Sequence, residues 1–201
     1  MVRETVFSLI YTHYQMTMTE SATNGAIAPL KKANDVRIEL GELTIHNINQ
    51  LRVINRTVFP VNYTDKFYTD LLKNPQLCRL AYFNDIVVGA VCYRFEKAEG
   101  SDNLKNCYIM TLGCLAPYRR YGVGSMLLKH VLRMCVKNTQ VQAVYLHVHV
   151  ENDDAVKFYQ RFDFEITGKV ENYYRRLLPQ DAYILKLTID HSVPISDSDS
   201  D

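Results

Sequence analysis

Short apolar runs separated by polar turns predict most of the strands in this chain. Residues 36–40 alternate apolar and polar positions, which is typical of a half-buried strand. The apolar runs 80–83 and 86–94 flank Asn84 and Asp85, so together they predict a β-hairpin. Further strands are predicted from the apolar runs at 109–115, 144–150, 164–168 and 183–188.

Helical spacing and capping residues predict two helices after the first strand. The first covers residues 45–55, with Thr44 as its cap, and a shorter one covers about 65–72. Residues 58–63 form an apolar, aromatic loop between them, because Pro60 cannot lie in the interior of a helix.

Two more helices follow in the second half of the chain. One starts at a glycine turn and runs to about Asn138, and the other covers 153–161 and can be capped by Asn152. The longer helix has one buried face, formed by Leu127, Leu128, Val131, Leu132 and Cys135. The element order is therefore β α α β β β α β α β β. It predicts an α/β fold with a mixed, mostly antiparallel sheet, helices on both faces, and one parallel pair around the glycine turn.

Composition changes along the chain predict one domain with two tails. Residues 1–35 lack periodicity and are predicted to be a flexible extension, whereas 36–190 carry the strands and helices. Residues 191–201 end in Ser-Asp repeats and are predicted to be an acidic, disordered tail. Length supports this division, because 201 residues suit one domain with tails.

Charge and apolar content exclude several classes of protein. The net charge is +1, so no basic field argues for direct binding of nucleic acid. No apolar run approaches ~18 residues, so we predict no membrane span. The five cysteines show no Cys-x-x-Cys pair and several lie in apolar runs, which predicts free thiols in a reducing compartment.

The glycine turn between the strand at 109–115 and the longest helix is suited to an anion. The first N–H groups of a helix have no partner within it, and the helix dipole favours negative charge there. Gly122 and Gly124 allow a close approach to the backbone, and Arg119 and Arg120 add positive charge. The P-loop pattern is absent, and Leu127 stands where a dinucleotide fingerprint would need its third glycine. The turn therefore predicts a phosphate or diphosphate site of another kind.

Two motifs resemble the GCN5-related N-acetyltransferase (GNAT) family. Arg119-x-x-Gly122-x-Gly124 resembles the loop that binds the pyrophosphate of acetyl-CoA, and residues 152–164 resemble the segment after the family's fifth strand. Asp163 departs from the pattern, which usually has glycine there; left-handed backbone at this position costs Asp about 1 kcal/mol relative to Gly. Dispersed segments within 36–187 further resemble the family's N-alpha-acetyltransferases of the NatE type: 37–41, 59–68, 80–86, 108–120, 145–148 and 172–174.

The resemblance implies acetyl-CoA as co-substrate and assigns residues to it. Asn152 would contact the CoA arm, and Tyr159 would lie near the sulfur. Amides around Leu112 and Cys114 would bond the pantetheine as an added strand does. The complete set of residues assigned to acetyl-CoA is Leu112, Gly113, Cys114, Leu115, Arg119, Arg120, Gly122, Val123, Gly124, Ser125, Asn152, Phe158 and Tyr159.

Tyr108 and His147 are the catalytic pair that the resemblance implies, handling the proton of the amine through an ordered water. Strand periodicity puts Tyr108, Met110 and Leu112 on one face of their strand. It puts Tyr145, His147 and His149 on one face of the other. From residue type alone, Tyr108 and His147 are equally core residues with satisfied polar groups. His147 and His149 also form a His-x-His pair, but no third ligand has suitable spacing, so we predict no metal.

An apolar slot for the first side chain of a peptide is also implied by the resemblance, and it suits an initiator methionine. The residues assigned to the peptide are Phe59, Pro60, Val61, Tyr63, Met110, Tyr173 and Tyr174. An α-amino group has a pKa near ~8 and lysine near ~10.4, so roughly 2.5 units, about 3.4 kcal/mol, favour deprotonation of a peptide N-terminus. Lysine acetylation remains open as a slower, secondary reaction.

The predicted function is N-alpha-acetylation of proteins that retain an initiator Met, by direct attack without an acyl-enzyme. Cys107 and Cys114 have no basic partner in sequence and are predicted to be structural. The resemblance also implies nascent chains as substrates, the auxiliary and catalytic subunits of a NatA-type complex and through them the ribosome as partners, and a role in sister-chromatid cohesion. It implies a cytoplasmic location, with the nucleus as a second compartment. The alternatives are a lysine or small-amine acetyltransferase of the same fold and a non-enzymatic or partner-dependent subunit of such a complex.

Overall fold

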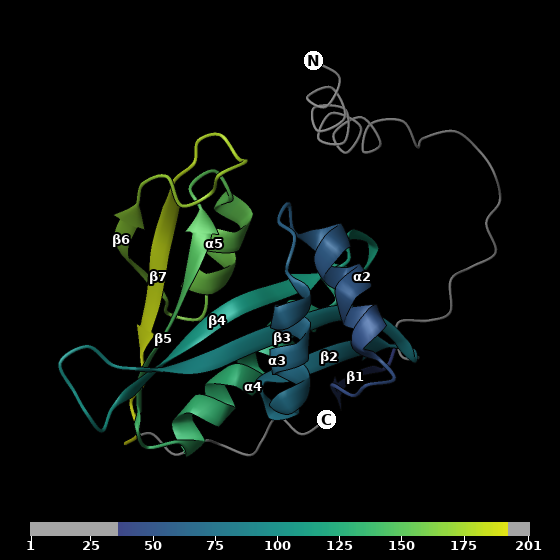
Figure 1. The fold of residues 1–201 in the computed structure, drawn as a ribbon, viewed down its shortest axis with the longest axis horizontal. Helices are drawn as coiled ribbons and strands as arrows, with labels where there is room; N and C mark the ends of the chain where they lie inside the picture. The colour runs from purple at the N-terminus through teal and green to yellow at the C-terminus, as the bar shows by residue number, and fades with distance from the viewer. Residues whose placement is uncertain (1–35, 193–201) are drawn as a thin grey trace. The chain divides into compact units, whose positions relative to one another are not determined.

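Residues 36–192 are described by the computed structural model, and they form one seven-stranded sheet covered by helices (Figure 1). The strand order is β1-β2-β3-β4-β5-β7-β6, and every neighbouring pair is antiparallel except β4 and β5. The mixed, mostly antiparallel sheet was predicted from the sequence and is confirmed. The strands are β1 (Ile38–Glu42), β2 (Cys78–Phe83), β3 (Ile86–Lys97), β4 (Lys105–Cys114), β5 (Val141–His149), β6 (Glu165–Val170) and β7 (Ala182–Thr188).

Two hydrophobic cores, one on each face of the sheet, hold the helices in place. The helices are α2 (Ile48–Val58), α3 (Asp65–Lys73), α4 (Val123–Lys137) and α5 (Asp153–Gln160). Apolar residues of α2 and α3, such as Leu51 and Leu71, are buried together with Leu80 of β2. Residues of α4 and α5, such as Leu128 and Tyr159, are buried with the opposite face of the sheet. Helices therefore cover both faces, as predicted.

The pairing of β4 and β5 stops halfway along the sheet. The two parallel strands pair from Lys105 and Val141 up to Tyr108 and Tyr145, and no further. Strands β5, β7 and β6 then run at a steep angle to β1–β4 (Figure 1). One edge of β4 beyond Tyr108 is consequently left without a neighbouring strand.

A β-bulge in β4 lies at this same point. Tyr93 of β3 pairs with Ile109 and the preceding Cys92 pairs with Thr111, so Met110 is the extra residue. Before the bulge, Ile109 contributes to the α4 core; after it, Leu112 does so, while Met110 packs on the α2 side. The prediction that Leu112 shares a face with Tyr108 and Met110 is therefore wrong, because the bulge inverts the alternation.

Helix α2 is displaced by three residues from its predicted position. Residues 45–47 form a turn, and the side chain of Asn47 accepts a hydrogen bond from the Thr44 backbone N–H at 2.7 Å. Thr44 is therefore not the cap. The helix continues to Val58, because only Phe59 is forced into extended backbone by the following proline.

Turn residues with left-handed backbone fall where the sequence indicated. Asn84 and Asp85 have φ angles of 46° and 69° and join β2 to β3 as a tight hairpin. Asp163 has a φ angle of 62°, as predicted for the position where related sequences have glycine. Asn152 caps α5, since its Oδ1 accepts the Ala155 N–H at 3.2 Å.

His191, near the end of the described residues, still contacts the domain. The ring of His191 lies 2.8 Å from the Val141 carbonyl and 3.2 Å from the Val136 carbonyl, so the chain still contacts the domain one residue past the predicted boundary. The predicted extension at 1–35 and the tail from 193 lie outside the described residues. Within residues 36–192, no helix combines the length and apolar character that a membrane span needs.

All five cysteines are free thiols, as predicted. Cys78 and Cys92 lie opposite each other on β2 and β3, with their sulfur atoms 3.6 Å apart. The hydrogen bond with Cys92, together with burial, raises the pKa of Cys78 far above its usual value, so the thiol stays protonated.

Asp163→Gly should stabilise the domain. Removing the side chain relieves the left-handed backbone, so we expect the free energy of unfolding to rise by about 0.5–1 kcal/mol in denaturant titrations. Asp163→Asn is the matched control, because Asn tolerates the same conformation, and it should leave the stability near that of the unchanged chain. A glycine variant less stable than the asparagine variant would contradict this account.

Candidate active site

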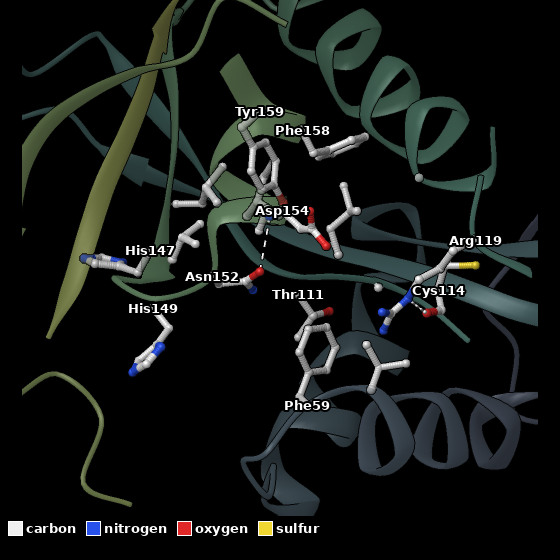
Figure 2. A pocket seen from close by; sticks show the side chains of 18 of the residues that line it. Phe59, Thr111, Cys114, Arg119, His147, His149, Asn152, Asp154, Phe158 and Tyr159 are labelled. Atoms are coloured by element: carbon white, nitrogen blue, oxygen red, sulfur yellow. Dashed lines mark hydrogen bonds between the residues drawn. The ribbon is translucent and has the colours of Figure 1, made fainter. Parts of the chain in front are cut away.

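A cavity of about 710 Å³ opens where β4 and β5 part (Figure 2). Its walls come from β4, the end of β5, α5, the start of α4 and the loop after α2. The volume lies within the usual range of ligand sites, roughly 300–1,000 Å³. The cavity therefore exists because two parallel strands stop pairing while their flanking helices remain packed.

One end of the cavity is built to hold an anion. Gly122 precedes α4 with a φ angle of 88°, and Gly124 and Ser125 follow in the first turn of the helix. The Arg119 side chain donates from Nε to the Cys114 carbonyl at 3.3 Å, which joins the glycine turn to the end of β4. Free N–H groups at the start of α4, together with the Arg119 and Arg120 side chains, give this end positive potential.

Helix α5 adds two cations that the sequence reading missed. Lys157 and Arg161 line the cavity beside Phe158, four residues apart and so on one face of the helix. Their spacing of four residues was the sequence signal that could have indicated a shared cationic face. Asp154 lines the same wall, so the site has mixed charge with an excess of cations.

The middle of the cavity exposes a strand edge. Residues 109–114 of β4 line it, and this edge has lost β5 as its neighbour. An extended chain or a pantetheine arm can therefore hydrogen-bond here as an added strand does. Thr111 also lines the wall, with a hydroxyl that has no hydrogen-bond partner among the described residues.

An apolar slot lies beside the last residues of β4, with Phe59 between Arg119 and His147 in Figure 2. Phe59, Pro60, Val61 and Met110 line it, and Tyr63 contacts the Phe59 ring edge-on at 6.2 Å. Gly113 is required beneath it: a Cβ there would lie 2.7 Å from Val58 and 2.9 Å from Phe59. The close approach of the loop to β4 therefore depends on a residue without a side chain.

His147 lies at the end of the cavity away from Arg119 (Figure 2), and Tyr108 meets it there. The Tyr108 hydroxyl lies 3.2 Å from Nδ1 of His147 and 3.0 Å from the hydroxyl of Tyr173. The Tyr173 ring stacks on the His147 ring at 4.3 Å. Residues 65 positions apart thus form one hydrogen-bonded group.

Burial keeps both members of this pair neutral. It lowers the pKa of His147 below its usual 6.5, against a smaller opposing effect of the Glu96 carboxylate. Burial, with help from the hydrogen bond to Tyr173, raises the pKa of Tyr108 well above its usual value. At neutral pH the imidazole is therefore free to accept a proton, and the phenol keeps its own.

The His149 ring is engaged by the Pro179 carbonyl and does not form a metal-binding pair with His147. Its Nε2 lies 2.6 Å from the Pro179 carbonyl and so donates a hydrogen bond to it, and its ring meets the edge of Tyr174 at 5.6 Å. Figure 2 shows the two histidines at the same end of the cavity. Among residues 36–192, no group of three or more His, Cys, Asp or Glu side chains could hold a metal.

The cysteines near the cavity are unsuited to nucleophilic catalysis. Burial raises the pKa of the Cys114 thiol, against a smaller effect of Arg119, and its sulfur faces the Leu115 carbonyl at 3.5 Å. Cys107 is fully buried away from the cavity lining. Neither residue has the thiolate character that a nucleophile needs.

Most of the predicted site residues line this one cavity, and four do not. Tyr108 and Tyr173 do not line the cavity but contact the lining residues His147 and Tyr174; Val123 is buried in the core under α4, and Leu115 packs on the core under α2. Sequence reasoning missed Thr111 and Leu177 as well as the cations of α5. The predicted residues that line the cavity are Phe59, Pro60, Val61, Tyr63, Met110, Leu112, Gly113, Cys114, Arg119, Arg120, Gly122, Gly124, Ser125, His147, Asn152, Phe158, Tyr159 and Tyr174.

Comparisons with known proteins agree with this geometry. The sequence profile of the acetyltransferase (GNAT) family matches residues 48–164. The chain is 53% identical over 153 residues to "N-alpha-acetyltransferase 50" of Danio rerio, covering 76% of this chain and 89% of that protein. It is 48% identical over 159 residues to "Probable N-acetyltransferase san" of Drosophila melanogaster, covering 79% and 85%.

A solved structure extends the similarity to three dimensions. Arabidopsis thaliana Naa50, in complex with the bisubstrate analogue CoA-Ac-MVNAL, superposes with a TM-score of 0.69 and 45% identity. The match covers 76% of this chain and 99% of that one. The resemblance to NatE-type proteins that the sequence motifs indicated is thereby confirmed.

Asn152→Ala should weaken α5, the helix that carries the cationic wall. Losing the side chain that accepts the Ala155 N–H removes the N-cap, so we expect the free energy of unfolding to fall by about 1 kcal/mol in denaturant titrations. Asn152→Ser keeps a capping oxygen and serves as the control. Equal stability of the alanine and serine variants would show that this cap contributes nothing.

Proposed function

The chain belongs to the acetyltransferase (GNAT) family, and from this premise we propose that it transfers the acetyl group of acetyl-CoA to the α-amino group of protein N-termini. One observation carries the proposal. A single cavity joins a helix N-terminus suited to an anion at one end to the neutral Tyr108–His147 pair at the other, with an apolar slot between them. Acetyl transfer needs these elements in one place.

The residues of the cavity fit acetyl-CoA. The N–H groups at the start of α4 and the arginines before it suit the pyrophosphate, and the glycine backbone allows its close approach. Gly124 lies under the Phe158 ring, where a Cβ would come within 3.5 Å. The free edge of β4 around Leu112 and Cys114 suits the pantetheine amides.

His147 and Tyr108 have complementary parts in the proton transfer. Bound acetyl-CoA supplies the acetyl group as a thioester. The α-amine attacks the thioester carbonyl directly, without an acyl-enzyme; the C–N bond forms as the C–S bond breaks, and CoA leaves as the thiolate. His147 takes the proton from the amine through an ordered water, because its imidazole is neutral. Tyr108 orients that water as a neutral phenol and is held by His147 and Tyr173.

The apolar slot selects the first residue of the substrate. Phe59, Pro60, Val61 and Met110 present only apolar surface, which suits an unbranched methionine side chain. Tyr173 and Tyr174 hold the peptide backbone over the slot. The Arabidopsis relative was solved with the bisubstrate analogue CoA-Ac-MVNAL, whose peptide begins with methionine. This supports an initiator Met as the first residue of the substrate here too.

Lysine acetylation is a slower, secondary activity in this proposal. The lysine amine costs about 3.4 kcal/mol more to deprotonate than an α-amine at the same pH, and His147 is only a weak base. The cellular setting that we propose comprises nascent chains, the subunits of a NatA-type complex with its ribosome, and a role in sister-chromatid cohesion. It is a cytoplasmic setting, with the nucleus as a second compartment. Similarity to NatE-type relatives supports it.

Two peptides test the activity and the slot together. Labelled acetyl-CoA should modify the α-amine of a peptide that starts Met-Leu, and a peptide that starts Ser-Glu should react at least tenfold more slowly. Tyr108→Phe should lower kcat by about 100-fold, because it removes the hydroxyl that His147 and Tyr173 share. Tyr121→Phe changes an exposed tyrosine and is the control. Binding of acetyl-CoA without transfer to either peptide would favour a partner-dependent subunit instead.

The pH dependence tests His147 as the base. The imidazole must be unprotonated to act, so kcat at saturating substrate should fall as the pH drops through the pKa of His147. Burial lowers that pKa, so the acidic limb should lie below pH 6.5. His147→Gln should give a slower reaction with no such limb. An unchanged limb in that variant would rule out His147.

A further inference from the structure

Three side chains lie in a row across the sheet next to the catalytic pair. Arg94 of β3 pairs with Tyr108 of β4, and Tyr108 pairs with Tyr145 of β5. Directly opposite residues on neighbouring strands point to the same face of the sheet. Tyr108 therefore lies between an arginine and a tyrosine, at the last position where β4 and β5 still pair.

Both neighbours contact the ring of Tyr108. The Arg94 guanidinium lies 5.1 Å from the ring centroid, and the Tyr145 ring lies 4.9 Å away, tilted by 35°. These contacts constrain the ring from its two strand neighbours. The position of the Tyr108 hydroxyl relative to His147 follows from the ring's orientation.

Glu96 joins the two neighbours to each other. It lies two residues after Arg94 on β3 and so on the same face of that strand. Arg94 donates to Oε1 of Glu96 from Nε at 2.7 Å, with its terminal nitrogen 2.5 Å away, and Tyr145 donates its hydroxyl to Oε2. One carboxylate thus binds the polar ends of both side chains that flank Tyr108.

We propose that Glu96 is a positioning residue for acetyl transfer, which clasps Arg94 and Tyr145 and thereby fixes the Tyr108 ring. This proposal rests on the proposed function, in which Tyr108 and His147 handle the amine proton. Glu96 acts through these neighbours and touches neither substrate. Glu96 binds the Tyr145 hydroxyl, the Tyr145 ring contacts the Tyr108 ring, and the Tyr108 hydroxyl lies beside His147.

The clasp needs a charged Glu96 carboxylate and a protonated Tyr145 phenol, and the surroundings favour both states. Burial by itself would raise the pKa of Glu96, but hydrogen bonds from Tyr145 and Arg94 outweigh it and hold the pKa below its usual value. Burial, together with the Glu96 hydrogen bond, raises the pKa of Tyr145 to about 12. A charged acceptor and a protonated donor therefore persist across the working pH range.

Precise placement of Tyr108 matters because its hydroxyl satisfies two partners at once. A misplacement of about 1 Å in a catalytic group can cost on the order of 100-fold in rate. The groups that face His147 are Glu96 from β3, Tyr108 from β4, Tyr145 from β5 and Tyr173 from the loop after β6. Arg94 of β3 contacts the Tyr108 ring instead. Of the groups that face His147, Glu96 is the anion, so it also favours the protonated form of His147.

Steady-state kinetics of the full chain with the Met-Leu peptide test the clasp. Glu96→Ala should lower kcat by about tenfold, with the KM for both substrates changed by less than twofold. Tyr145→Phe keeps the ring but loses the bond to Glu96, and it should lower kcat to a similar extent. The double variant should be no slower than either single variant, because both changes break one bond. Glu99→Gln removes an exposed charge from the same hairpin and should leave kcat unchanged.

Glu96→Gln separates geometry from charge. Its amide oxygen can still accept from Tyr145, but its NH2 cannot accept from Arg94, so kcat should lie between those of Glu96→Ala and the unchanged enzyme. The acidic limb of kcat should move to lower pH, since His147 loses an anion that favours its protonated form. An unmoved limb would contradict the arrangement in which Glu96 faces His147, and circular dichroism checks that each variant is folded.

Three results would overturn the clasp. They are an unchanged kcat in Glu96→Ala, a rise in peptide KM at constant kcat, and a double variant about 100-fold slower, which would mean independent effects. If the unchanged enzyme transfers no acetyl group to the peptide, the proposed function itself fails. If it does and the Glu96 variants match it, only the clasp fails.

Discussion

The site depends on the point where β4 and β5 stop pairing. Up to Tyr108 and Tyr145 the two parallel strands share hydrogen bonds, and beyond them the bulge at Met110 turns the side chains of β4. The unpaired edge and the cavity beside it both follow from this one interruption. On either side of the opening, β4 stays paired with β3 apart from the bulge, and β5 stays paired with β7 from Ala143 to His149, so the sheet supports the opening from both sides. A loss of backbone pairing is thus offset by the packing of helices on both faces.

Burial determines the protonation states of Tyr108 and His147 beside this opening. Removing Tyr108 and His147 from water makes charge unfavourable on both, so the phenol keeps its proton and the imidazole stays free to accept one. The cationic end of the cavity works in the opposite way, since exposed arginines and helix N–H groups favour an anion. One cavity therefore has a cationic end suited to a phosphate and a neutral end that holds an imidazole able to accept a proton.

The surroundings of the Tyr108–His147 pair come from all three strands that meet where β4 and β5 part. Glu96 and Arg94 belong to β3, Tyr108 to β4, and Tyr145 and His147 to β5. Tyr173, from the loop after β6, closes the group by stacking on His147. Because rigid strands carry most of these residues, the geometry is set by sheet register rather than by loops.

The sequence by itself determined the element order, the mixed sheet, the glycine turn with its arginines, and the family. Each depends on local patterns, such as helical spacing, Gly122 and Gly124 before α4, or Asn152 as a cap. Only the tertiary structure decided that Leu112 lies on the opposite face from Tyr108, because a bulge adds one residue without any mark in the sequence. The tertiary structure also placed Lys157 and Arg161 at the cavity wall. It brought Tyr145 into contact with Glu96, which is 49 positions away in the sequence. Such contacts depend on strand register, which periodicity within one segment cannot specify.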